Sequence, residues 1–129
     1  MARTVPCGHA ERVGRLRKAD LFWEAAGMID DLWDENQEIA DVYVTLCVHA
    51  GIAAADVICC AALGKRSRGE GHAEAVSLLA SVDVGASGHL STLLAMKTRA
   101  GYSSVPSTAV QRRKAERAAR SLLEAARLL

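Results

Sequence analysis

The chain has 129 residues, of which half are hydrophobic and only five are aromatic, so Ala and Leu dominate the apolar set. This size suits one domain with one core, and the composition favours packed helices over sheets, which prefer β-branched and aromatic residues. The net charge is +1, but residues 19–56 carry nine acids and no Lys or Arg, and bases predominate on both sides. Such segregation either steers an acidic partner such as RNA toward the basic regions or neutralises itself within the fold or a dimer.

The chain begins with a segment that shows no helical periodicity. We expect residues 1–9 to form a short flexible arm and residues 10–129 to form one helical bundle. From Ala10 to Trp33, apolar residues recur at steps of three and four, which predicts an amphipathic helix. A polar run follows and ends this helix.

A second helix is predicted over residues 38–63, and it is apolar on nearly every side. Such a helix must lie in lipid or among other helices. Asp56 near the centre of a lipid span would cost roughly 2.5–3.5 kcal/mol, which the many Ala and Gly residues offset poorly. We therefore expect a buried central helix, without a membrane, that ends at Gly64 as its C-terminal cap.

The remaining sequence predicts three more helices. A basic loop over residues 64–71 leads to a helix over residues 72–81, and a second loop precedes a helix over residues 90–102. Pro106 interrupts this pattern, and a capping box between Thr108 and Gln111 begins the last helix. No segment alternates like a strand. The predicted fold is all-α, an antiparallel up-and-down bundle of four to five helices.

The chain has four cysteines, whose spacing matches neither a disulfide framework nor a CxxC pair. We interpret them as small buried hydrophobic residues in a reducing cytosol. No metal site and no cofactor are expected. The N-terminal residues contain no apolar signal region, so we expect a cytoplasmic protein. These cysteines are Cys7, Cys47, Cys59 and Cys60.

Three segments in order carry a resemblance to a known family: VHAGIAAADVICCAALGKRSRGEGHAEAVSLL, then LLAMKTRAGYSS, then RKAERAARSLLEAARLL. This succession resembles the HEPN domain over about residues 10–129. The resemblance implies an up-and-down bundle, usually a homodimer, whose function lies in a cleft along the dimer seam. Many HEPN proteins are metal-independent ribonucleases, and several are toxins paired with a nucleotidyltransferase-like antitoxin, which is therefore an expected partner.

The resemblance also implies a catalytic signature, an Arg followed by four to six residues and a His. The Arg position falls at Arg99, but Ser104, Val105 and Pro106 occupy the places where the His is expected. Arg99 alone can hold a phosphate, but it cannot exchange protons near neutral pH as His does. A catalytic His would have to come from elsewhere. The candidates are His72, which follows Arg66 after five intervening residues, and His49.

Other residues are candidates for holding an anion or for a polar contact. His49 and Asp56 lie two helical turns apart on one face, either as a cleft element or as a buried polar pair that fixes helix register. A buried Asp56 needs a partner, for which Arg99 or Lys97 are candidates. The predicted anion-binding side chains are Lys97, Arg99, Tyr102, Lys65, Arg66 and Arg68.

We expect a HEPN-like domain that binds RNA, a nucleotide or a partner protein without ribonuclease activity. One alternative is a divergent ribonuclease that uses Arg99 with His72 or His49. The other is a structural interaction module, in which the acidic and basic segments serve assembly.

Overall fold

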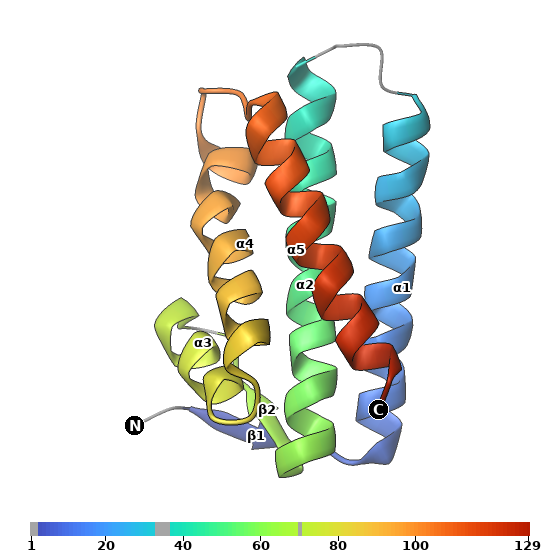
Figure 1. The fold of residues 1–129 in the computed structure, drawn as a ribbon, viewed down its shortest axis with the longest axis vertical. Coiled ribbons are helices and arrows are strands. Elements are labelled where there is room, and N and C mark those ends of the chain that lie inside the picture. The colour runs from blue at the N-terminus through green and yellow to red at the C-terminus, as the bar shows by residue number, and fades with distance from the viewer. Residues whose placement is uncertain (1–2, 33–36, 70) are drawn as a thin grey trace.

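The computed structural model describes residues 3–32, 37–69 and 71–129, which form a helical bundle with a small two-stranded ribbon. The long helices run alternately up and down (Figure 1), so the predicted all-α fold is confirmed. The first helix ends before Trp33, which lies outside the described residues. The elements are β1 (Thr4–Pro6), α1 (His9–Asp31), α2 (Gln37–Leu63), β2 (Lys65–Ser67), α3 (His72–Ala80), α4 (Val84–Tyr102) and α5 (Ala109–Arg127).

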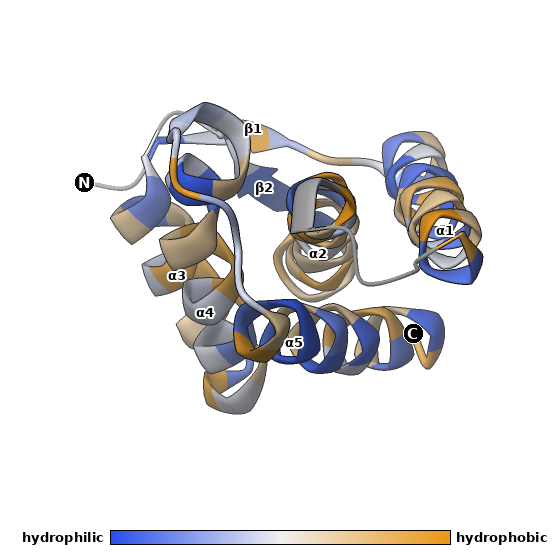
Figure 2. Ribbon diagram, turned by 90° about the horizontal axis from the view of Figure 1, so that it is seen from above, coloured by the Kyte–Doolittle hydropathy of each residue, from blue (hydrophilic) through white to orange (hydrophobic). Residues whose placement is uncertain are grey.

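Helix α2 is the central element of the bundle. Seen from above, α1, α4 and α5 lie on three sides of it, and the ribbon lies on the fourth (Figure 2). All residues from 53 to 60 are buried, including Asp56. Among the described residues, one stretch, Ile39–Leu63, is long and apolar enough to span a membrane, and most of it is buried against the other helices.

Gly51 lets α4 and α5 approach α2 closely. A Cβ atom at this position would lie 2.2 Å from Leu93 Cδ1 and 3.2 Å from Leu122 Cδ1. Both leucines are fully buried, so their side chains fill the space that the missing Cβ leaves. The small residues of α2 thus set the spacing of the core.

The helix ends follow local capping chemistry. Thr108 and Gln111 form the predicted capping box at the start of α5, and Gly64 ends α2 with a positive φ of 68°. The start of α4 differs from the prediction, because the helix begins at Val84 and not near residue 90. The Asp83 carboxylate accepts a hydrogen bond from the Ala86 N–H at 2.9 Å, and this cap stabilises a first turn that contains Gly85.

The predicted flexible arm is wrong for the described part of residues 1–9. Residues 4–6 pair antiparallel with residues 65–67, and the Cys7 N–H donates to the Gly64 carbonyl at 2.9 Å. Three-residue strands are too short for the apolar alternation by which strands are recognised. The sequence therefore contained no signal for this ribbon.

The interpretation of all four cysteines as reduced is also wrong. Cys7 and Cys60 form a disulfide that joins the segment after β1 to the last turn of α2, whereas Cys47 and Cys59 are buried free thiols. The two bonded residues are 53 positions apart, so only the packing of β1 along the end of α2 brings them together. The cytoplasmic localisation was inferred in part from reduced cysteines, whereas disulfides persist mainly in oxidising compartments. The localisation stays a prediction.

Candidate anion-binding site

A cavity of about 220 Å³ opens beside the end of α2, between β2, the start of α3 and the facing sides of α1 and α4. Its floor is apolar, and its wall contains three of the predicted anion-binding residues, Arg66, Arg68 and Lys97. The apolar lining comprises Ile52, Ala55, Cys59, Ala75, Leu90 and Leu94. The polar lining comprises Arg15, Asp56, Arg66, Ser67, Arg68, His72 and Lys97.

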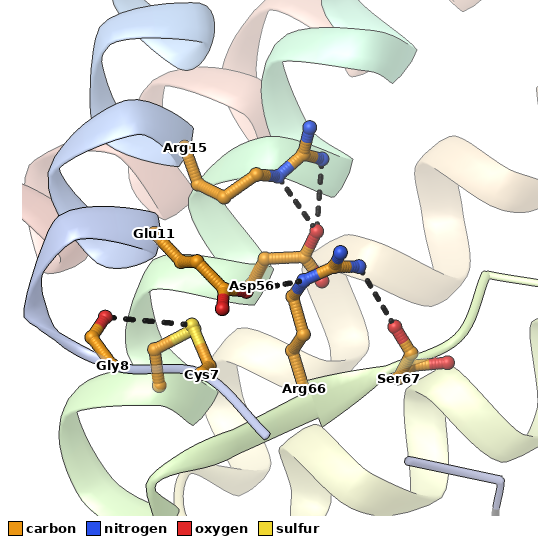
Figure 3. The surroundings of a disulfide bond; sticks show 8 residues. Cys7, Gly8, Glu11, Arg15, Asp56, Arg66 and Ser67 are labelled. Carbon is orange, nitrogen blue, oxygen red and sulfur yellow. Dashed lines mark hydrogen bonds and ion pairs between the residues drawn. A yellow bond between two sulfur atoms is a disulfide. The ribbon is translucent and has the colours of Figure 1, made fainter. Parts of the chain in front are cut away.

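Asp56 is held from α1 by Arg15. The Nε and Nη2 atoms of Arg15 both donate to Asp56 Oδ2, at 2.9 and 2.8 Å (Figure 3). Burial raises the pKa of the Asp56 carboxyl above its ordinary value of 3.8, and the charges of Arg15 and Arg66 oppose this rise. The predicted partners, Lys97 and Arg99, do not form this pair.

Strand β2 brings Arg66 and Arg68 to the cavity. Arg66 Nη1 donates to the Ser67 carbonyl at 3.2 Å, and Nε lies 4.0 Å from Glu11 Oε2 (Figure 3). This Nε is buried and has no hydrogen-bond acceptor among the described residues. After the strand, Gly69 adopts a φ of 88° and its N–H donates to Ser67 Oγ at 3.2 Å, which fixes the turn that leads to α3.

Two cations of the cavity are available to a ligand. Within the part of the chain that the structure describes, Arg68 and Lys97 form no ion pair, although five other ion pairs are present. Lys97 reaches the cavity from α4, and His72 reaches it as the first residue of α3. These side chains are thus free to meet an anion.

His49 lies outside this cavity, and the predicted His49–Asp56 pair does not form. The His49 ring is exposed and stacks on Phe22, with ring centroids 5.4 Å apart and an interplanar angle of 29°. It lines a neighbouring cavity with Lys18. Partial burial lowers the pKa of His49, and the nearby charges of Lys97 and Arg15 lower it further.

The other predicted anion-binding residues lie elsewhere. Arg99 is exposed near the end of α4, Tyr102 is 82% exposed, and the Lys65 side chain is exposed on β2. None of the three lines the cavity. Arg99 therefore does not meet either candidate His in a common site.

Sequence reasoning missed Arg15, which connects α1 to the cavity. Its signal was indirect: a buried Asp on α2 requires a cation, and the first eighteen residues contain five bases. Nothing in the spacing distinguished Arg15 from Arg12 or Arg17, because the choice depends on how α1 is rotated against α2.

No protein-family model matches the chain, and neither the curated proteins nor the solved structures show a significant match to it. Membership of the HEPN family, a homodimer and an antitoxin partner thus stay predictions. The cavity has to be interpreted from its own chemistry.

Proposed function

We propose that this domain is a HEPN-like module that binds a phosphate-bearing ligand in the cavity beside α2. The ligand is a nucleotide, either free or as one unit of an RNA chain, and the domain does not cleave it. One observation carries the proposal. Four cationic side chains line a small cavity with an apolar floor, against a single described carboxylate, Asp56.

The charges of the cavity are unevenly balanced. Arg15 contacts Asp56 directly and offsets its charge. Arg66 is paired with Glu11. This leaves Arg68 and Lys97 to face a ligand, and a guanidinium group such as that of Arg68 binds phosphate oxygens through paired N–H donors. The apolar floor suits the flat face of a base or sugar. A nucleotide combines both chemistries.

Ribonuclease activity is a second candidate, and it depends on His72. This imidazole lines the cavity together with Arg66 and Arg68, so a proton donor or acceptor and a phosphate clamp share one site. Acid–base cleavage of RNA uses two groups that exchange protons, whereas the described part of the cavity offers one imidazole. For this reason we favour binding over catalysis.

Titration of AMP and of a labelled single-stranded RNA tests the proposal at 50 and 200 mM salt. In the double variant Arg68→Gln/Lys97→Gln, we expect affinity to fall about tenfold or more and the salt dependence to weaken. The matched control is Arg113→Gln/Lys114→Gln, which removes the same charge from the exposed side of α5. Equal loss in both variants, or no binding at low salt, contradicts the proposal.

Cleavage is measured on the same RNA. We expect the wild-type protein to leave it intact over hours. Cleavage that disappears in His72→Ala and persists in Arg99→Ala would establish the second candidate instead. An interaction module without ligand would bind neither AMP nor RNA.

A further inference from the structure

A second cavity adjoins the one beside α2. Arg15 and Ile52 line both, and the second has a volume of about 440 Å³. No residue of α5 lines either cavity, so the two lie along the side of α2 that α5 leaves uncovered. We refer to the two adjoining cavities as the α2 groove.

The groove is long enough for several nucleotides. Its floor follows α2 from His49 in the second cavity to Cys59 in the first. Ten residues of helix span about 15 Å, and stacked nucleotides of one strand are about 3.4 Å apart. The floor therefore accommodates about four stacked nucleotides.

Positive charge follows the whole length of the groove. Arg68 lies at the β2 end, Lys97 reaches the first cavity from α4, and Lys18 lines the second cavity from α1. Among the described residues, Asp56 is the one carboxylate that lines the groove, and it is paired with Arg15. Sites that bind single strands without sequence preference combine such a basic track with aromatic stacking platforms.

The stacked rings of Phe22 and His49 supply the platform in the second cavity. His49 is exposed, so its ring is accessible from the cavity that it lines. Burial and the charges of Lys97 and Arg15 lower the pKa of His49, and a neutral imidazole at pH 7 stacks as an uncharged aromatic ring.

We infer that the α2 groove binds a single-stranded RNA segment of about four nucleotides. Its phosphates lie along Arg68, Lys97 and Lys18, and one base stacks on the Phe22–His49 pair. The inference rests on the proposed function, which concerns the first cavity alone. A duplex is a poor ligand, because its bases face inward and cannot reach the groove floor.

The test compares AMP with oligoadenylates of two, four and six nucleotides, an RNA hairpin and a hexaglutamate peptide. We expect affinity to rise at least tenfold from AMP to the tetranucleotide and then to level off. Phe22→Leu should weaken tetranucleotide binding about tenfold and leave AMP binding unchanged. His49→Gln gives a second readout if Phe22→Leu unfolds, and Tyr102→Leu, an exposed aromatic outside the groove, is the control.

The outcomes separate the two proposals. Equal affinity for AMP and the tetranucleotide, with Phe22→Leu and His49→Gln both without effect, overturns the groove and leaves the first cavity as a nucleotide site. Binding of neither AMP nor any oligonucleotide overturns the proposed function as well. Hexaglutamate that competes as strongly as the tetranucleotide overturns the inference and favours an acidic protein segment as the ligand of the groove. A hairpin that binds as tightly as the tetranucleotide also overturns the inference, because it shows no preference for a single strand.

Discussion

Arg15 on α1 holds Asp56 on α2 through two N–H groups that meet the same carboxylate oxygen, at 2.9 and 2.8 Å. The two residues are 41 positions apart, and their side chains are 25% and 12% exposed. The pair crosses the interface between the first two helices at the place where both form the wall of the cavity. Substitutions of Arg15 and of Asp56 are expected to change the free energy of unfolding by different amounts.

Arg15→Met should lower the free energy of unfolding by about 1–3 kcal/mol, because it leaves a buried carboxylate with Arg66 as its remaining close cation. Met keeps the apolar stem of the side chain in place. Asp56→Asn should change stability by less than about 1 kcal/mol, since the amide removes a charge that burial disfavours and still accepts a hydrogen bond from Arg15. Urea unfolding at pH 7 measures both variants. Equal losses in the two would contradict this account.

The pH dependence of the pair has a definite sign. The pKa of Asp56 is raised above 3.8 in the folded state, so the folded protein holds this proton more tightly than the unfolded chain. Its stabilising contribution is present below pH 3.8 and is lost as the pH rises through the folded pKa. Relative to Asp56→Asn, the wild-type protein should lose stability over this window, which unfolding curves at several pH values can measure.

The disulfide predicts a coupling between stability and the site. Cys7→Ser/Cys60→Ser should lower the free energy of unfolding by about 2–4 kcal/mol, because the bond closes a loop across 53 positions. It should also weaken ligand binding, since β1 pairs with the strand that carries Arg66 and adjoins Arg68. Dithiothreitol should give the wild-type protein the properties of this variant and leave the variant itself unchanged.

Thiol counting checks the same bond directly. In denaturant without reductant, iodoacetamide should modify two thiols, those of Cys47 and Cys59. Four modified thiols would show that the bond is absent.

In the folded protein, burial and the Asp56 charge raise the pKa of Cys59 to about 11, so its thiol stays protonated near neutral pH and does not attack the neighbouring disulfide.

Most of the fold was predictable because its signals are local. The periodicity of α1, the apolar character of α2 and the capping box of α5 each lie within one segment. The β1–β2 ribbon and the Cys7–Cys60 bond were not predictable. Each joins two segments that are more than fifty positions apart, and neither segment has a sequence pattern that identifies the other as its partner. Only the packed bundle brings them into contact.

The candidate site was predictable in part for a similar reason. Arg66, Arg68 and His72 are close in sequence and remain close in the cavity. Lys97 joins them, but Arg99 does not, because two helical positions turn a side chain by about 200° and direct it away. The family resemblance drew attention to Arg99, whereas helix geometry assigns the cavity to Lys97.

His49 should report the positive charge of the groove. Its pKa is lowered below 6.5 in the folded state, so its contribution to stability is present above pH 6.5 and is lost as the pH falls through the folded pKa. His49→Gln should therefore reduce the loss of stability between pH 7.5 and 5.5. An NMR titration of the His49 ring protons measures the pKa, and Lys97→Gln should raise it by removing a nearby positive charge. An unchanged pKa in that variant would place Lys97 too far from His49 to share the groove.

The close approach at Gly51 can be tested with a matched pair of glycines. Gly88 lies on the exposed side of α4, and a Cβ there would meet nothing within 4 Å, so Gly88→Ala should stabilise the protein by about 0.5–1 kcal/mol through helix propensity alone. Gly51→Ala has the same gain, but its methyl group overlaps Leu93 and presses on Leu122.

Overpacking of that kind costs about 1–3 kcal/mol, because both leucines are fully buried and have little room to shift. Gly51→Ala should therefore be less stable than Gly88→Ala by about that amount in urea unfolding, with the same denaturant slope. Adding Leu93→Val to Gly51→Ala shortens the side chain that causes the overlap and should recover part of the loss. If Gly51→Ala instead gains as much stability as Gly88→Ala, then α4 and α5 do not approach α2 as closely as these contacts require.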